Sequence, residues 1–86
     1  MSNELKQRFD VAATDAKSLP QRPSNDDLLE LYALYKQGSE GDVSGSRPGL
    51  LDFVGGAKYD AWSKISGMSN LEAMQRYVEK VTELKG

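Results

Sequence analysis

The sequence predicts an all-α fold in a single domain that spans residues 1–86. Apolar side chains recur at spacings of three and four residues in four segments, which is the period of one helical face. Capping residues, proline or glycine stand at the ends of these segments, as they do at many helix termini. No stretch alternates apolar and polar side chains for long enough to form a β-strand.

The first helix is expected at about residues 3–18. Its apolar side chains form one stripe: Leu5, Phe9, Ala12, Ala13, Ala16 and Leu19. Pro20 and Pro23 end this helix, because proline lacks the amide hydrogen and its ring clashes with the preceding turn.

The second helix is expected to begin after Ser24, whose hydroxyl can accept a hydrogen bond from a backbone amide, with Asp27 placed to reach back. It is expected to end in the glycine-containing segment at residues 38–41. The apolar face between these signals carries Leu28, Leu29, Leu31, Tyr32, Leu34 and Tyr35.

A long loop, residues 41–52, follows the second helix. Within it, Pro48 and Gly49 suit the central positions of a type II turn. Connections between helices in a plain up-and-down bundle usually take about 2–8 residues. A longer connection indicates a crossover, so the second and third helices need not be antiparallel neighbours.

The third helix is expected within residues 53–66, where Gly55 and Gly56 favour a loop at its beginning and Gly67 fits the position just after its end. One face carries Lys58, Ala61, Trp62 and Ile65. The fourth helix opens at Ser69, a capping residue followed three positions later by an acid. Its buried stripe is expected to contain Met74, Tyr77, Val78, Val81 and Leu84.

The composition excludes several classes of function. The chain has no cysteine and no histidine, which removes disulfides, thiolate zinc sites and Ser-His or Cys-His catalytic pairs. A net charge of −2 argues against nucleic acid as a partner, because binding to phosphate backbones usually needs a basic surplus. No window approaches the roughly 20 apolar residues of a membrane span. We therefore expect a cytoplasmic protein with no integral membrane segment, no metal and no catalytic residue.

Tyrosines and lysines lie at the edges of the apolar stripes on all four expected helices. They are Lys17, Tyr32, Tyr35, Lys36, Lys58 and Tyr77. The three on the second helix stand at i, i+3 and i+4 and therefore share one face. If these side chains converge, they form a pocket for an anionic aromatic ligand. The alternative is that the tyrosines are core residues and the lysines extend along the surface to water.

Three blocks of the sequence have a recognisable spacing. They are YALYKQ at residues 32–37, DVSGSRPGLLDFVGGAKYDAW at residues 42–62, and the segment from Ala73 to Leu84. In this order they resemble the YxxYKQ element, the GD…RPG…D…GAKWDAW signature and the C-terminal helix of the acyl-CoA-binding protein family. The resemblance covers nearly the whole chain.

The resemblance implies a four-helix bundle with up-down-down-up topology, in which the long crossover loop joins a roughly parallel second and third helix. It also implies a monomeric carrier of medium- to long-chain acyl-CoA esters that catalyses no reaction and needs no cofactor. Matching positions give an implied ligand-binding set: Ala13, Lys17, Leu28, Leu29, Tyr32, Tyr35, Lys36, Lys58 and Tyr77. Within this set, Lys58, Tyr32 and Lys36 are implied to meet the ribose 3′-phosphate. Ala13 lies where the adenine end is approached, and the leucine pair matches positions that line the acyl groove.

The chain departs from the family pattern at several positions. Val54 and Gly56 stand where many members carry a basic residue, and Tyr59 replaces a tryptophan. The basic C-terminal tail that is common in the family is lacking after Gly86. We expect these differences to influence the affinity for the nucleotide and the preferred length of the acyl chain.

Two rival functions belong to other classes. One is a helical interaction module whose tyrosines and leucines bind a partner helix. The other is a small helical enzyme that uses lysine, arginine and glutamate electrostatics on an anionic substrate. The first predicts binding to a protein and indifference to CoA, and the second predicts turnover.

Overall fold

The computed structural model describes residues 2–86, and within them it contains helices and no strand. The elements are α1 (Ser2–Asp15), the 3-10 helix η1 (Ala16–Ser18), α2 (Asn25–Ser39), α3 (Phe53–Ser63) and α4 (Asn70–Lys85). The predicted all-α class is thus confirmed. The first expected helix is also confirmed, except that its last turn tightens into η1.

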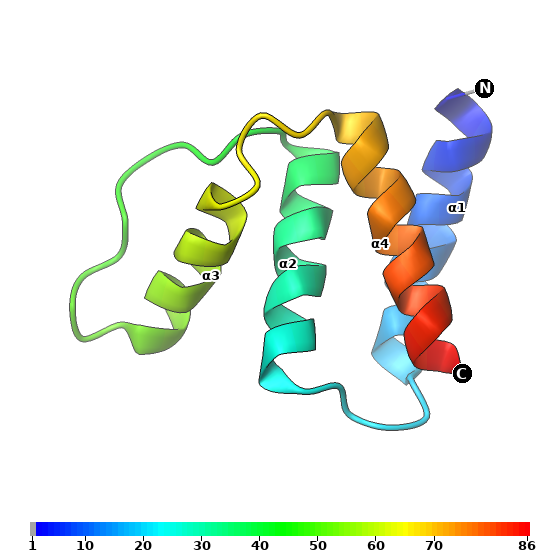
Figure 1. Ribbon diagram of the computed structural model, residues 1–86, viewed down its shortest axis with the longest axis horizontal. Helices are drawn as coiled ribbons and strands as arrows, with labels where there is room; N and C mark the ends of the chain where they lie inside the picture. The colour runs from blue at the N-terminus through cyan, green and yellow to red at the C-terminus, as the bar shows by residue number, and fades with distance from the viewer. Residues whose placement is uncertain (1) are drawn as a thin grey trace.

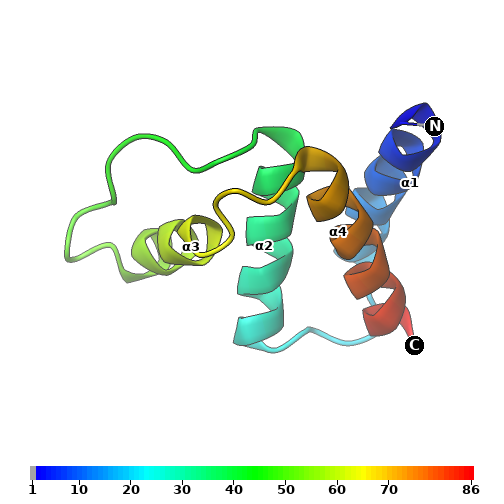
Figure 2. The same ribbon diagram turned by 45° about the horizontal axis from the view of Figure 1, so that its top comes forward.

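α2 is the central helix of a flat molecule that measures 38 × 30 × 15 Å (Figure 1). It packs against α3 on one side and α4 on the other, and α1 packs against α4. α2 and α3 run in the same direction, whereas α1 and α4 run in the opposite one. The loop between α2 and α3 returns along the outside of the molecule, as Figure 2 also shows. The expected crossover and up-down-down-up topology are therefore confirmed.

Serine caps begin α2 and α4 as the sequence predicts. The Ser24 hydroxyl accepts a hydrogen bond from the Asp27 amide at 3.1 Å. The Ser69 hydroxyl accepts one from the Glu72 amide at 3.0 Å. Each cap satisfies an amide that has no partner within its helix. The carboxylate of Asp27 also lies 2.8 Å from the Lys80 ammonium, which ties the start of α2 to the end of α4.

The main apolar core lies among α1, α2 and α4. Its buried members are Phe9, Ala12, Leu31, Leu34, Ala73, Met74, Tyr77, Val78 and Val81. These residues recur every three or four positions along each helix, so one face of each helix is buried. α3 contributes no member to this cluster, and its one large buried side chain is Trp62.

A polar network centred on Gln37 fixes α3 and the loops beside it. The Gln37 side chain is fully buried, and its amide nitrogen donates to the Asp42 carboxylate at 2.7 Å and to the Met68 carbonyl at 2.8 Å. Its amide oxygen accepts from the Trp62 indole N–H at 3.0 Å. The same indole N–H donates to the Gly41 carbonyl at 2.8 Å. The end of α2, the start of the crossover loop and the end of α3 are joined through this one amide.

The start of α3 differs from the expectation. Gly55 and Gly56, expected in a loop, are helical, because the Asp52 carboxylate accepts from the Gly55 amide at 2.8 Å and begins the helix before them. Gly56 is buried beneath the Arg47 guanidinium, where a β-carbon would lie 2.8 Å from the nearest guanidinium nitrogen. Arg47 in turn makes a paired contact with the Asp60 carboxylate at 2.9 and 3.0 Å. The close approach of Arg47 explains why glycine stands at position 56.

The expected type II turn at Pro48 and Gly49 is wrong. That turn requires a positive φ at its third residue, and the glycines with positive φ are Gly41, Gly45, Gly67 and Gly86. The turn lies further along the chain instead, where the Asp52 amide donates to the Gly49 carbonyl at 3.0 Å. Gly67 has the positive φ, +93°, expected of a residue that follows a helix, but it is not the residue directly after α3, which ends at Ser63 with Lys64 as its C-cap.

Replacing Gln37 by leucine tests the polar network. Gln37→Leu removes the partner of the Met68 carbonyl and one partner each of Asp42 and Trp62, so the free energy of unfolding should fall by about 1–3 kcal/mol. Urea unfolding followed by circular dichroism measures this change. Gln75→Leu is the matched control, because Gln75 is exposed and its side chain, among residues 2–86, bonds only to exposed Glu79 at 2.9 Å. Equal unfolding midpoints for the two variants would contradict the role given to Gln37.

Asp42 should make the stability depend on pH. Hydrogen bonds from the Gly67 amide and then from Gln37 hold the pKa of its carboxyl below the ordinary value of 3.8. A lowered folded pKa means that the charged group stabilises the fold above about pH 4, and that this contribution is lost as the pH falls through the folded value. Asp42→Asn should therefore lower the free energy of unfolding at neutral pH, with a deficit that shrinks on acidification. A deficit of constant size in urea unfolding across the acid range would refute this assignment.

Candidate functional site

A groove of about 620 Å³ opens where the end of the first helix faces α2, α3 and α4. It is lined by Ala13, Ala16, Lys17, Leu28, Leu31, Tyr32, Tyr35, Lys58 and Tyr77. Seven of these nine lining residues belong to the set predicted from the sequence; the additional ones are Ala16 and Leu31. Both additions lie on the predicted apolar stripes, so the helical period could have identified them.

Three aromatic rings form a compact wall behind this groove. The Phe9 ring is buried and stacks on Tyr35, with 5.3 Å between ring centroids. It meets Tyr77 edge-on at 5.2 Å, and Tyr35 lies 5.7 Å from Tyr77. Contacts of this kind fix ring orientation beyond simple burial. Burial, and to a smaller extent Tyr35, raises the pKa of the Tyr77 hydroxyl above its ordinary value.

The charge along the groove is positive. Lys58 holds its ammonium 5.2 Å above the centre of the Tyr32 ring, and Lys17 is exposed at the rim. No carboxylate lines the groove, and within residues 2–86 neither of these lysines forms an ion pair. An unpaired ammonium beside an aromatic face is suited to an anionic ligand that also carries a planar ring.

Lys36 lies outside the lining of the groove. Its ammonium pairs with the Glu40 carboxylate one helical turn later and lies 5.1 Å from the centre of the Trp62 ring. The hydrogen bond from Lys36 to Glu40 raises the pKa of the ammonium. In this structure Lys36 is thus separate from the other predicted residues, and it can contact a ligand in the groove only after leaving Glu40.

A second hollow, of about 400 Å³, continues from the groove. The two share Leu28 and Lys58, so they form one continuous surface. We call this second part the apolar hollow; its lining is Arg22, Asn25, Leu28, Leu29, Phe53, Val54, Ala57 and Lys58. Leu29, the remaining predicted residue, lies here. Arg22 and Phe53 were not predicted, because they come from irregular segments or helix ends where periodicity places no side chain.

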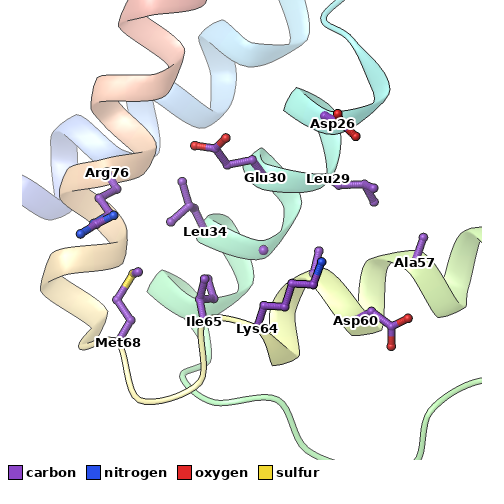
Figure 3. Close-up of a pocket in the computed structure, with 12 residues that line it drawn as sticks. Asp26, Leu29, Glu30, Leu34, Ala57, Asp60, Lys64, Ile65, Met68 and Arg76 are labelled. Atoms are coloured by element: carbon purple, nitrogen blue, oxygen red, sulfur yellow. The ribbon is translucent and has the colours of Figure 1, made fainter.

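A third hollow, of about 570 Å³, shares Leu29 and Ala57 with the apolar hollow and otherwise lies on the face of α2 opposite the groove (Figure 3). Its lining residues on α2 are about half a helical turn away from those of the groove. Three carboxylates surround it, from Asp26, Glu30 and Asp60, together with Lys64 and Arg76. Its mixed charge makes this hollow less suited to a polyanion than the groove.

The groove and the apolar hollow together offer three chemical features. Lysines provide positive charge, tyrosines provide ring faces and hydroxyl donors, and leucines and Ala57 provide an apolar surface next to them. Among residues 2–86 there is no group of histidine, cysteine or acidic side chains arranged to hold a metal ion. Among the same residues, none of the helices combines the length and the apolar character needed to cross a bilayer. The arrangement is suited to a ligand with an anionic, aromatic head and an apolar tail.

Comparison with known proteins gives one consistent family. The sequence model described as acyl-CoA-binding protein matches residues 6–81. An acyl-CoA-binding protein homolog of Manduca sexta is 51% identical over 81 residues, which cover 93% of this chain and 90% of that protein. An acyl-CoA-binding protein of Gossypium hirsutum is 48% identical over 80 residues and covers 93% and 90%, respectively.

Solved structures agree with the sequence matches. The crystal structure of acyl-CoA-binding protein 2 of Oryza sativa matches with a TM-score of 0.92 at 43% identity, and the match covers 96% of this chain and 90% of that one. The crystal structure of the Moniliophthora perniciosa protein of this type matches with a TM-score of 0.86 at 46% identity, covering 92% and 78%. At these identities the likeness extends beyond the fold to the sequence.

Proposed function

This chain belongs to the acyl-CoA-binding protein family, and we propose that it binds medium- to long-chain acyl-CoA esters in the groove and the apolar hollow. The observation that carries the proposal is the continuity of the two spaces at Leu28 and Lys58. One part offers cations and tyrosines, and the other offers an apolar wall. An acyl-CoA ester has the same two parts joined by a flexible linker.

The nucleotide is proposed to bind in the groove. Lys58 and Lys17 carry unpaired charge for its phosphates, and ammonium–phosphate hydrogen bonds are among the stronger polar contacts in proteins. The rings of Tyr32 and Tyr35 offer flat faces to adenine, and the small side chain of Ala13 allows the ring to approach α1. The Tyr77 hydroxyl is a further donor toward an anionic group.

We propose that Lys36 contacts the ligand only once the ligand has bound. Its ammonium is on the helix that carries Tyr32 and Tyr35, but it is paired with Glu40 in this structure. A phosphate carries more charge than one carboxylate and accepts more hydrogen bonds. We therefore propose that Lys36 exchanges Glu40 for the 3′-phosphate when the ligand binds, at the cost of the existing pair.

The acyl chain is proposed to occupy the apolar hollow along Leu28, Leu29 and Ala57. Each buried CH₂ contributes about 0.8 kcal/mol, so a sixteen-carbon chain contributes about 10 kcal/mol as an upper limit. The cost of ordering the chain reduces this value. Burial of the tail therefore determines most of the affinity, and the contacts with the nucleotide determine which class of ester is bound.

We further propose that the protein is a carrier or pool former for these esters and catalyses no reaction. The groove presents tyrosines, lysines and apolar side chains, and none of them is paired with a neighbouring base that would activate a nucleophile. A monomer in the cytoplasm, with no nucleic-acid partner, is the form in which we propose that it acts. The family match does not favour the rival function of a helical interaction module.

Three ligands test the two-part site. Palmitoyl-CoA should bind far more tightly than CoA, because the chain supplies the larger apolar area. Palmitate should bind weakly or undetectably, because it lacks the phosphates and the adenine ring. Isothermal titration with each ligand at one ionic strength measures these differences and the number of sites, which should be one per chain. Equal affinities for palmitate and palmitoyl-CoA would remove the nucleotide site from the proposal.

Lysine variants test the phosphate contacts. Lys58→Ala deletes a charge-assisted hydrogen bond of roughly 1.5–3 kcal/mol, so acyl-CoA affinity should fall about ten- to a hundredfold. Lys36→Ala should cost less, because the ligand must first displace Glu40 from Lys36. Lys64→Ala is the matched control, since Lys64 is an exposed α3 residue that lines the hollow on the opposite face of α2.

The ligand can be varied in the same experiment. If Lys36 and Lys58 meet the 3′-phosphate, the losses should shrink for the dephospho form of the ester. Binding curves for the three variants with both esters provide the measurement. If Lys36→Ala and Lys58→Ala bind both esters as well as Lys64→Ala does, the assigned phosphate site is wrong.

A further inference from the structure

Four large apolar side chains are exposed together where the crossover loop enters α3. Leu50 is 85% exposed, Leu51 is 90%, Phe53 is 77% and Val54 is 67%. We call residues 50–54 the apolar tip. Scattered apolar residues are common on protein surfaces, whereas a contiguous exposed cluster usually marks a site of interaction.

The internal structure of the protein does not account for the exposure of the apolar tip. Leu50 and Leu51 line none of the three hollows described above. The tip is nevertheless held in place, because the Asp52 amide donates to Gly49 and the Asp52 carboxylate caps α3. The ion pair between Arg47 and Asp60 fixes the loop against α3 just before the tip. The fold therefore presents these side chains to the solvent in a defined position.

The apolar tip projects from the molecule. The turn before α3 lies at the outer edge, on the side away from α1 and α4 (Figure 1). A projecting group of leucine and phenylalanine side chains fits a soft apolar layer, whereas a folded protein partner would have to supply a matching pocket. The shape therefore favours a lipid bilayer as the occupant.

The charges beside the apolar tip complement an anionic bilayer. Phe53 and Val54 line the apolar hollow together with Arg22 and Lys58, and no carboxylate from the described part of the chain lines that hollow. Within residues 2–86, Arg22 bonds only to the Pro23 carbonyl and the Asn25 amide, both neutral groups. Surface binding to bilayers strengthens with buried apolar area and with cations close to anionic headgroups. Both features occur here. The one acid within the tip, Asp52, directs its carboxylate to the Gly55 amide at 2.8 Å, where the start of α3 partly offsets its negative charge.

We propose that the apolar tip inserts into the interfacial region of an anionic phospholipid bilayer, with Arg22 and Lys58 facing the headgroups. The mouth of the apolar hollow then lies at the membrane surface. Docking requires no bound ligand. If the proposed acyl-CoA function also holds, an acyl chain can pass between the bilayer and the hollow without crossing bulk water.

Vesicle co-sedimentation of the ligand-free protein tests this proposal. The probes are vesicles of phosphatidylcholine with phosphatidylserine in equal amounts, and vesicles of phosphatidylcholine alone. The variant is the double substitution Leu50→Ser with Leu51→Ser, which alters the two most exposed side chains and leaves the lining of the hollow unchanged. Because serine cannot supply the apolar burial that each leucine gains in the interface, the partition coefficient should fall about tenfold or more. The anionic vesicles should bind the unaltered protein about tenfold more tightly than the neutral ones.

The matched control is Val11→Ser with Leu71→Ser, two side chains that are 59% and 51% exposed on α1 and α4. This control should partition like the unaltered protein. Palmitoyl-CoA titration without vesicles should give the same affinity for all three proteins, so failure of the ligand function and failure of docking are separate results.

Three outcomes of the vesicle experiment would overturn the proposal. They are no co-sedimentation of the unaltered protein, equal loss in the tip and control variants, and equal partition to anionic and neutral vesicles. A tip variant that binds vesicles normally but loses a stable protein partner would assign the tip to a protein interface instead and would also overturn it.

Discussion

The buried amide of Gln37 determines where α3 lies, and the position of Lys58 depends on α3. The apolar cluster joins α1, α2 and α4 without α3, so burial in that cluster does not position the third helix. Instead, the Trp62 indole N–H meets Gln37 and the Gly41 carbonyl, while the Gln37 amide nitrogen reaches Asp42 and Met68. Hydrogen bonds are directional, so they fix the position of α3 relative to α2, which apolar contact alone would not fix. The groove lies between α3 and the end of the first helix, so its shape depends on where this network places α3.

The distribution of charge, rather than its total, determines what the groove can bind. The chain carries a net charge of −2, yet among residues 2–86 no carboxylate lines the groove or the apolar hollow. Several acids are paired elsewhere: Asp27 and Glu30 with Lys80, Glu72 with Arg76, and Asp60 with Arg47. Lys17 and Lys58 remain unpaired among the described residues, so they retain their full charge for a ligand. Lys36 is the exception, since Glu40 one turn later on the same helix neutralises it.

Much of the fold could be predicted, because helix formation depends on neighbouring residues. The serine caps, the proline stop after the first helix and the positive φ of Gly67 all follow from local chemistry. The errors at Gly55–Gly56 and at Pro48–Gly49 have a common cause. Each assignment used the intrinsic preference of glycine, whereas the cap from Asp52 and the close approach of Arg47 decide the backbone there. Those contacts form only when the loop folds back along α3.

The sequence by itself determined the helical class, the faces that are buried and most of the residue types that line one groove. Spacing along a helix places Tyr32, Tyr35 and Lys36 on one face, but it contains no information about the neighbouring helix. Only the tertiary structure decided that Lys58 and Lys17 reach the groove while Lys36 turns to Glu40. Only the tertiary structure joined the groove to the apolar hollow and left residues 50–54 exposed. Helical periodicity is a property of adjacent turns, whereas a groove and its open edge depend on contacts between segments distant in the sequence.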